Sequence, residues 1–327
     1  MSNIAIIGAG VAGLTALQSL KEAGHSVTVF DKSRGSGGRL SSKKTGESSW
    51  DMGAQYLRAH TPEFQQTLEQ WEANGWVAEW SLTPWSIDGE SRTSSADDVK
   101  RYVGMPRMTG LSRQLLAAAD DFITSTRITE VLFDGEWILI SEEGDRFGPF
   151  SEIVLNMPPE QARDLIPETS SLHGAVDDLP MNPCWTLLLG FDQALDTPMD
   201  GAFVKSGPLA WIARNNSKPG RDPREAWVIQ ASHDWSQAHV DVPREQVIEQ
   251  LSAAFAEALG LALPPAADVW VHRWLFSVPA KAPKLGALRD ETHNLTVCGD
   301  WCERPSVEGA WISGQNAARL LAGDNHE

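Results

Sequence analysis

Cysteine is scarce in this chain of 327 residues, which contains only Cys184, Cys298 and Cys302. Three cysteines at such uneven spacing cannot form the disulfide framework of a small secreted protein, and they suit a reducing compartment. The N-terminus also lacks a basic leader followed by an apolar stretch, and no run reaches the ~20 apolar residues of a membrane-spanning helix. These absences predict a soluble, cytoplasmic protein without a membrane partner.

Positive charge is in deficit as well. The chain carries 27 Lys and Arg against 44 Asp and Glu, a formal net charge of -17. This imbalance argues against nucleic acid or an anionic membrane surface as a partner, so any anionic ligand must be held by local groups. The eight histidines form no ligand cluster, and no metal site is predicted. The length suits one large domain or two modest ones, and we predict two.

The first 31 residues carry the pattern of a dinucleotide-binding unit. An apolar run at residues 4–7 predicts a strand buried on both faces. Apolar residues at helical spacing predict a helix over residues 11–23, and a second apolar run at 27–30 predicts another buried strand. Together these segments make a β–α–β unit of about 30 residues, the length that such a unit requires.

The connection between the first strand and the helix has the sequence GAGVAG at residues 8–13. In this context Gly8 permits a tight turn, Gly10 lets the backbone approach phosphate oxygens, and Gly13 allows close packing. The N-terminus of the helix attracts a pyrophosphate through its unpaired N–H groups and its dipole. Asp31, at the end of the second strand, can accept hydrogen bonds from the adenosine ribose. The pattern predicts a bound dinucleotide.

Three further segments favour FAD over a nicotinamide dinucleotide as the cofactor. A loop of glycines and arginines at residues 31–39 follows the second strand, where a nicotinamide dehydrogenase would continue into a helix, and Arg39 is placed to bind phosphate. Residues 50–56 carry small side chains that let backbone approach a flat ring. Asp300 follows a late strand and can hold the ribityl hydroxyls, while a final helix over 309–321 directs positive charge at the flavin.

The rest of the chain divides at Pro158-Pro159. The Gly, Ser, Lys and Arg content of residues 32–49 predicts a loop. Further helices are predicted at residues 62–74, 111–119 and 244–259, and further strands at 127–132, 137–141, 153–156, 185–191, 226–231 and 295–298. We assign residues 1–60, 100–160 and 268–327 to an FAD-binding domain, and residues 61–99 and 161–267 to a substrate domain.

An ordered set of motifs resembles the flavin amine oxidase superfamily, and the renalase family in particular. The motifs are RGSGGR (34–39), DMGAQY (51–56), GMPRMTGLSR (104–113), CGD (298–300) and VEGAWISG (307–314). The resemblance implies an α/β fold in which a Rossmann-like β–α–β FAD-binding domain carries an inserted α+β substrate domain, as in p-hydroxybenzoate hydroxylase and the amine oxidases. Residues 159–268 have no residue-by-residue match.

The resemblance also implies an activity. Renalases hold FAD non-covalently and oxidise isomers of NAD(P)H with the hydride at ring position 2 or 6, passing the electrons to O2 to give H2O2 and NAD(P)+. The product is an aromatic pyridinium and the hydride leaves with its electron pair, so we expect no catalytic side chain, only the flavin N5 as hydride acceptor. The expected partners are the dihydronicotinamide dinucleotide and O2, and the expected state is a monomer.

The resemblance assigns site residues motif by motif. Beside Gly8, Gly10 and Gly13, it implies FAD contacts at Ala12, Asp31, Lys32, Arg39, Gln55, Tyr56, Asp300 and Ile312. Val131 is expected to contact the adenine through its backbone, because this superfamily makes such a contact in that strand region. Expected substrate contacts are Tyr56, Leu57, Arg58, Trp185 and Glu308.

Several alternatives remain open at this point. The main alternative is an amine oxidase of the same superfamily. The second is a flavin monooxygenase, which would need NADPH as reductant. The third is a non-catalytic FAD-binding protein. Cys298 and Cys302 form a CxxxC pair, for which buried structural thiols are the simpler interpretation. The candidates for binding a substrate pyrophosphate, or for forming surface ion pairs, are Arg58, Arg107, Arg214 and Arg273.

Overall fold

The computed structural model describes residues 1–46, 48–94 and 96–323. The chain forms two compact units, each built from separate segments of sequence. Unit 1 consists of Met1–Gly38, Leu111–Met181 and Val278–Glu327, and unit 2 consists of Arg39–Gly110 and Asn182–Ser277. Unit 1 contains the Rossmann-like β–α–β part, and unit 2 is a largely antiparallel sheet with helices, which confirms the predicted fold class.

Unit 1 is built on a mostly parallel sheet. In spatial order its strands are β19 (Leu288–Asp290), β20 (Leu295–Val297), β13 (Glu152–Leu155), β1 (Asn3–Ile7), β2 (Ser26–Phe30) and β9 (Asp121–Ile123). Strand β1 lies inside the sheet and pairs in parallel with both β2 and β13. Ile4, Ala5 and Ile6 are all fully buried, as expected for a strand that is covered on both faces.

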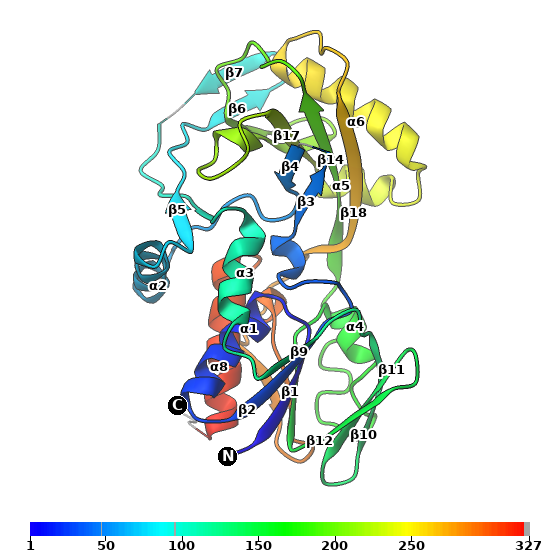
Figure 1. Cartoon of the computed structure of the whole chain (residues 1–327). Coiled ribbons are helices and arrows are strands. Elements are labelled where there is room, and N and C mark those ends of the chain that lie inside the picture. The colour runs from blue at the N-terminus through cyan, green and yellow to red at the C-terminus, as the bar shows by residue number, and fades with distance from the viewer. Residues whose placement is uncertain (47, 95, 324–327) are drawn as a thin grey trace. The chain divides into compact units, whose positions relative to one another are not determined.

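Two long helices of unit 1 pack side by side, α1 (Val11–Glu22) and α8 (Val307–Ala322) (Figure 1). Gly314 of α8 makes this packing close, because a Cβ at that position would lie 2.2 Å from the carbonyl oxygen of Ala12. The contact therefore brings α8 against the first turn of α1. The shorter helices α4 (Pro159–Arg163) and α7 (Asp300–Glu303) follow β13 and β20.

A second, antiparallel sheet completes unit 1. Its strands are β10 (Ile128–Phe133), β11 (Trp137–Ser141) and β12 (Arg146–Phe150). Trp137 is fully buried, and its indole N–H donates to the carbonyl oxygen of His293 at 2.8 Å. His293 lies in the turn between β19 and β20, so this hydrogen bond ties the small sheet to the edge of the large one.

The buried carboxylate of Asp290 organises that turn. Its Oδ2 accepts hydrogen bonds from Ser170 Oγ at 2.6 Å and from the backbone N–H of Ser171 at 2.8 Å, and it lies 2.9 Å from His293 Nδ1. Burial opposes ionisation, but the hydrogen bonds outweigh it and hold the pKa of Asp290 well below its usual range. The ionised carboxylate thus joins the segment around Ser170 to the sheet edge.

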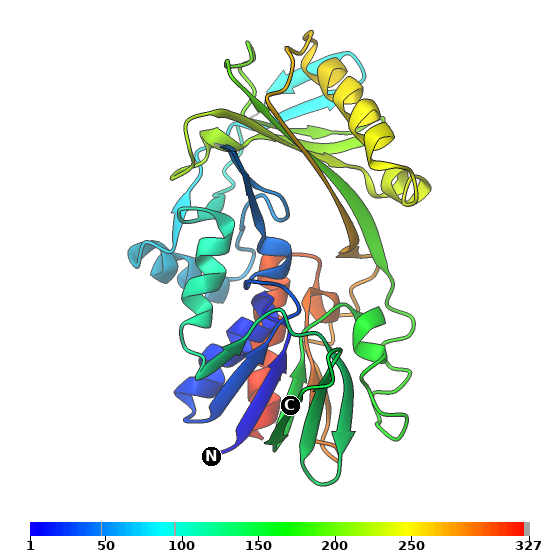
Figure 2. The same cartoon turned by 45° about the vertical axis from the view of Figure 1, so that its right-hand side comes forward.

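Unit 2 is built on a sheet of seven strands. In spatial order they are β18 (Asp268–Pro279), β14 (Met181–Phe191), β17 (Glu225–Ala231), β16 (Leu209–Arg214), β15 (Gly201–Val204), β6 (Trp85–Asp88) and β7 (Ser91–Ser94). Helix α6 (Arg244–Leu259) covers one face of this sheet (Figure 2). Its buried residues Leu251 and Phe255 pack with Trp227 and Ile229 to form the main core of the unit.

The segment predicted to be a loop over residues 32–49 contains strands instead. β3 (Ser42–Thr45) and β4 (Ser48–Asp51) pair antiparallel, and Trp50 donates its indole N–H to the carbonyl oxygen of Leu189 at 3.2 Å. The loop prediction is wrong because these strands consist largely of Ser, Lys and Thr and show no apolar alternation. Their stability comes from pairing and from Trp50, the one apolar residue among them, which is buried and packs with Val228.

The remaining elements of the fold are shorter. They are β5 (Val77–Glu79), β8 (Tyr102–Gly104), α2 (Pro62–Ala73), α3 (Met108–Leu116), α5 (His233–Ala238) and the 3-10 turns η1 (Gly38–Leu40) and η2 (Asn215–Ser217). Strands β5 and β8 pair antiparallel in unit 2. Within the described residues, no helix has both the length and the apolar character needed to cross a membrane.

The unit boundaries differ from the predicted domain boundaries. Residues 39–60, 100–110 and 268–277, predicted to lie in the FAD-binding domain, belong to unit 2, because β4 packs on β17, β8 pairs with β5 and β18 lies beside β14. Residues 161–181, predicted to lie in the substrate domain, belong to unit 1, where Ser170 is bound to Asp290. Positions 47, 95 and 324–327 of the predicted ranges lie outside the described residues.

We expect Asp290→Asn to lower the free energy of unfolding at neutral pH by about 2 kcal/mol, because an amide replaces a charged acceptor of several hydrogen bonds. The folded-state pKa of Asp290 is below its unfolded value, so its stabilisation is present above the unfolded pKa and is lost as the pH falls through the acid range. Wild-type protein should therefore lose stability below about pH 4 more steeply than the variant.

Urea unfolding followed by circular dichroism at neutral and acid pH measures both effects. The matched control is Glu291→Gln, which removes an exposed carboxylate next in sequence. Equal stability of Asp290→Asn and the control at neutral pH would contradict the assigned role.

Candidate functional site

The glycine turn at residues 8–13 joins β1 to α1 and is crowded by Asn156. Gly8 has a φ of +108°, and a Cβ there would lie 2.1 Å from the carbonyl oxygen of Asn156. A Cβ at Gly13 would lie 2.5 Å from Asn156 Nδ2, which donates to the Gly8 carbonyl oxygen at 2.9 Å. Glycine is therefore required at Gly8 by conformation and at both positions by space. Sequence reasoning missed Asn156, which carries no motif.

Helix α1 begins without a side-chain cap. Its N-cap residue is Gly10, which has extended backbone and no side-chain hydrogen bond to the first turn. The first amide groups of a helix have no intrahelical acceptor, and the helix dipole adds positive charge at the same place. Free backbone N–H groups at the start of a helix are the donors that bind a pyrophosphate, so the residues present fit the dinucleotide part of FAD.

Asp31 is oriented by the backbone of the glycine turn. Its Oδ2 accepts the N–H of Ala9 at 2.8 Å, and its Oδ1 accepts the N–H of Ser33 at 2.7 Å. A carboxylate has about four acceptor positions, so two are left for ribose hydroxyls. The loop that follows is bound to the same turn, because Gly37 donates its N–H to the Ala9 carbonyl oxygen at 2.7 Å.

The C-terminal segment meets the glycine turn within unit 1. Asp300, the first residue of α7, is 6% exposed, and the backbone N–H before it donates to Ser313 Oγ at 2.9 Å. Ser313 is next to Ile312 on α8, and α8 packs on Ala12 through Gly314. The structure therefore brings Ala12, Asp300 and Ile312 into one region.

Three other predicted contacts in unit 1 have partners of their own. Val131 pairs with Leu139 in the antiparallel sheet. Lys32 donates from Nζ to Gln161 Oε1 at 3.2 Å. Glu308 is fully buried in α8 and forms an ion pair with Arg304 one turn earlier.

The remaining predicted contacts lie in unit 2. Arg39 donates from Nη1 to the carbonyl oxygen of Ser277 at 2.9 Å. Leu57 is buried, and its backbone exchanges hydrogen bonds with Tyr102 at 2.7 and 2.9 Å. Arg58, next to it, is exposed.

Tyr56 lies in an aromatic group on the sheet face opposite α6. Its ring meets Trp211 edge-on, with centroids 5.8 Å apart, and Trp211 in turn contacts Phe203 at 4.7 Å. Trp211 precedes the core residue Ile212 in β16, so its side chain points to the opposite face. The guanidinium of Arg101 lies 5.4 Å from the centroid of the Tyr56 ring.

Trp185 is a core residue, contrary to its assignment to the substrate site. It is 2% exposed, packs with Ile229 beneath α6, and donates its indole N–H to the carbonyl oxygen of His239 at 3.0 Å. Its side chain therefore points away from the face that carries Tyr56. The sequence could not decide between the faces, because β14 is an almost continuous apolar run with both sides buried.

Two of the candidate arginines form ion pairs within unit 2. Arg214 lies 3.3 Å from Asp200, and Arg273 lies 3.5 Å from Asp241. All three cysteines are free and buried, and burial raises the pKa of Cys184 to about 11 and of Cys298 to about 12. These thiols therefore stay protonated at neutral pH. Within residues 1–46, 48–94 and 96–323, no group of three or more His, Cys, Asp or Glu side chains is placed to hold a metal ion.

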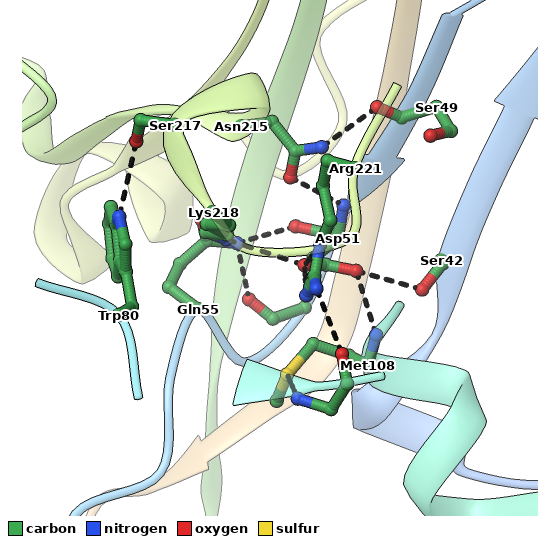
Figure 3. Close-up of polar contacts among 12 residues, drawn as sticks. Ser42, Ser49, Asp51, Gln55, Trp80, Met108, Asn215, Ser217, Lys218 and Arg221 are labelled. Atoms are coloured by element: carbon green, nitrogen blue, oxygen red, sulfur yellow. Dashed lines mark hydrogen bonds and ion pairs between the residues drawn. The ribbon is translucent and has the colours of Figure 1, made fainter. Parts of the chain in front are cut away.

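A buried cluster of charges in unit 2, formed by Asp51, Lys218 and Arg221, was missed by sequence reasoning (Figure 3). Asp51 Oδ2 accepts from Arg221 Nη2 at 2.5 Å and lies 3.5 Å from Lys218 Nζ. Its Oδ1 accepts the N–H of Met108, the first residue of α3, at 3.0 Å. One carboxylate thus faces two cations and the start of a helix, and the cluster carries a net charge of +1.

Burial and charge oppose each other in this cluster. Burial disfavours the ionised form of Asp51, but the charges of Lys218 and Arg221 outweigh it and lower the pKa of Asp51. Burial, opposed by Asp51 and reinforced by Arg221, lowers the pKa of Lys218 to about 8. Both side chains of the pair are essentially without solvent contact.

Gln55 connects the charge cluster to the DMGAQY segment. Its Oε1 accepts from Lys218 Nζ at 3.1 Å, while its Nε2 donates to the carbonyl oxygens of Asp51 at 2.5 Å and Gly53 at 3.0 Å. Both ends of the amide are therefore engaged within unit 2, and the orientation of the side chain is fixed.

Comparisons with known proteins agree with this geometry. A model of the NAD(P)-binding Rossmann-like domain matches residues 6–71, and a model of the flavin containing amine oxidoreductases matches residues 94–322. The chain is similar to an L-amino-acid oxidase from Siganus canaliculatus, 44% identical over 55 residues, and to a 4,4'-diapophytoene desaturase from Staphylococcus haemolyticus (strain JCSC1435), 48% identical over 50 residues. These matches cover 16% and 15% of the chain, and only 10% of the length of each relative.

Solved structures share the fold over nearly the whole chain. A "Putative protoporphyrinogen oxidase" from Exiguobacterium sp. 255-15 superposes with a TM-score of 0.80 at 11% identity, covering 99% of both chains. Wild-type putrescine oxidase bound to putrescine superposes with a TM-score of 0.75 at 14% identity, covering 98% of this chain and 99% of its own. At these identities the likeness establishes the fold alone.

We expect Gly13→Ala to reduce FAD retention strongly, because the added Cβ would meet Asn156 Nδ2 and the Gly8 carbonyl oxygen and displace the first turn of α1. The ratio of visible flavin absorbance to protein absorbance after purification measures retention. The control is Gly35→Ala, which adds a Cβ in the neighbouring loop with no atom within 4 Å. Full flavin occupancy in Gly13→Ala would contradict the assigned crowding.

Proposed function

The chain belongs to the family of flavin containing amine oxidoreductases, and we propose that as a member of this family it oxidises dihydro isomers of NAD(P)H. It is a flavin-dependent oxidoreductase with FAD as cofactor. In the proposed reaction a hydride leaves ring position 2 or 6 of the dihydronicotinamide, and its two electrons pass to O2. With one proton from solvent the products are NAD(P)+ and H2O2. When bound, FAD supplies the hydride acceptor and the route to O2.

The observation that carries the substrate class is the net positive charge beside Gln55. Lys218 and Arg221 exceed Asp51 by one charge, and all three are shielded from solvent. A primary amine is a cation at neutral pH and would be repelled there, whereas a dinucleotide carries anionic phosphates and would be attracted. The charge therefore favours a dinucleotide over an amine, although putrescine oxidase shares the fold.

The aromatic group around Tyr56 suits the same substrate. Tyr56 is half-buried and meets the buried Trp211 edge-on, on the sheet face opposite α6, and its ring is one on which a flat dihydropyridine can stack. The dihydropyridine loses its hydride without losing a proton, so these residues need only orient the ring and exclude water. We assign substrate binding to this face of unit 2 and dinucleotide binding of FAD to the glycine turn of unit 1.

Anaerobic mixing with 6-dihydro-NAD tests the substrate. We expect this compound to bleach the visible absorbance of the flavin, and the readmission of O2 to restore it with release of H2O2. Putrescine and other primary amines should leave the flavin oxidised, because the positive cluster repels them. Bleaching by amines, with none by the dihydronicotinamide isomers, would replace this proposal by amine oxidation.

Asp300→Ala tests the placement of the ribityl chain independently of the substrate. Loss of a buried charged acceptor should weaken FAD binding by about tenfold or more, as measured by titration of the FAD-free protein. Glu303→Ala, at the other end of α7, removes a similar charge and should bind FAD as wild type does. Unchanged FAD affinity in Asp300→Ala would show that the carboxylate does not touch the cofactor.

A further inference from the structure

Lys218 has no place in the sequence motifs, yet it is buried against the segment predicted to bind the flavin. We propose that Lys218 is a positioning residue, whose ammonium group fixes the Gln55 amide and thereby the backbone of residues 51–56 in the form that binds FAD. The inference rests on the proposed cofactor role of Gln55 and Tyr56. It does not depend on which substrate is oxidised.

The geometry gives Lys218 control over the orientation of Gln55. Lys218 follows η2, and its side chain has no solvent exposure. Its Nζ lies 3.1 Å from Gln55 Oε1, 3.5 Å from Asp51 Oδ2 and 5.3 Å from the centroid of the Trp80 ring (Figure 3). An ammonium group only donates, so it forces the oxygen end of the amide toward itself.

The opposite end of the Gln55 amide then holds the backbone. Its Nε2 donates to the carbonyl oxygens of Asp51 and Gly53, and the Gly53 oxygen also accepts from Gln230 Nε2 at 2.7 Å. A reversed amide would turn its oxygen toward these two carbonyl oxygens and lose both hydrogen bonds. The correct orientation therefore depends on Lys218.

The segment has little space in which to adjust. A Cβ at Gly53 would lie 2.0 Å from the carbonyl oxygen of Arg39, which accepts the N–H of Ala54 at 2.8 Å. Residues 53 and 54 are thus packed directly on backbone. A small rotation of the Gln55 side chain is transmitted to them rather than absorbed by a loose loop.

Lys218 is not needed to neutralise Asp51. Arg221 alone makes two hydrogen bonds to Asp51 Oδ2 and balances its charge. The charged groups that face Lys218 are Asp51 from β4 and Arg221 from its own loop, while Gln55 and Trp80 are neutral. The second cation adds a buried charge that the ion pair does not require.

The added charge lowers stability. Because burial lowers the pKa of Lys218 from 10.5 to about 8, the folded protein binds fewer protons than the unfolded chain between these values. Folding stability from this group therefore rises with pH across that window, and at neutral pH the ammonium destabilises the fold. A side chain that lowers the stability of the fold in this way contributes to the site rather than to stability.

The test measures FAD affinity and stability of the full chain after FAD has been removed. Lys218→Met keeps the length of the side chain without its charge, and Lys205→Met removes an exposed lysine of the same unit as control. We expect Lys218→Met to bind FAD about tenfold more weakly at neutral pH, with an unfolding temperature no lower than wild type. Wild-type FAD affinity in Lys218→Met, or weaker binding accompanied by a lowered unfolding temperature, would overturn the proposal.

One measurement remains decisive if Lys218→Met does not fold. In wild type, FAD affinity should fall as the pH rises through about 8, when the ammonium loses its proton, and in Gln55→Met this pH dependence should vanish. Where Lys218→Met does fold, the double variant should lose no more FAD affinity than Gln55→Met alone. Persistence of the pH dependence in Gln55→Met, or independent losses in the double variant, would show that Lys218 does not act through Gln55.

These experiments involve no substrate. Failure of 6-dihydro-NAD to reduce the flavin would remove the proposed reaction and leave the result on Lys218 standing. Unchanged FAD affinity in Lys218→Met, with normal reduction of the flavin by 6-dihydro-NAD, would remove the inference on Lys218 and leave the proposed reaction standing.

Discussion

Backbone occupies the space where side chains would stand around the first turn of α1. The carbonyl of Asn156 lies against Gly8, its amide lies against Gly13, and the carbonyl of Ala12 lies against Gly314. Because these positions are glycines without a Cβ, β13 and α8 can approach the turn from two sides. The start of α1 is left without a side-chain cap, and the anion site follows from its free N–H groups. The same approach sets Asp300 nearby, at the place assigned to the ribityl hydroxyls.

Unit 2 uses charge where unit 1 uses close backbone packing. Asp51 joins the end of β4, the start of α3 and the loop that carries Lys218 and Arg221. Arg221 balances the charge of Asp51 through two hydrogen bonds, and removing one partner of such a buried pair typically destabilises a protein by about 3–5 kcal/mol. Asp51 and Arg221 are therefore held firmly in place. Because the Asp51 carboxylate is held firmly, the small residues that follow it begin from a fixed backbone position. The motif DMGAQY alone does not explain why this backbone is fixed.

The part of the site whose residues lie close together in sequence could be predicted. The part that depends on residues far apart in sequence could not. The strands, the glycine turn, α1 and Asp31 depend on neighbours within about 30 residues, which periodicity and spacing reveal. Lys218 and Asn156 act on partners 167 and 148 residues away, and nothing in their surroundings marks them. The polar hairpin β3–β4 was misjudged although its pairing is local, because its one apolar residue, Trp50, is buried against strands far away in sequence. The direction of Trp185 was misjudged because distant elements decide which face it occupies.

The segmented construction of unit 1 affects the order in which the protein can assemble during synthesis. β1, α1 and β2 leave the ribosome first, but β20, α7 and α8 belong to the last segment, which begins at Val278. Until they emerge, β13 has a free edge on the side later taken by β20 and the glycine turn lacks its partner helix. A nascent chain stalled before this segment would expose an apolar strand edge, the kind of surface on which chains associate. Completion of the cofactor site is thus delayed until the segment that begins at Val278 has been made.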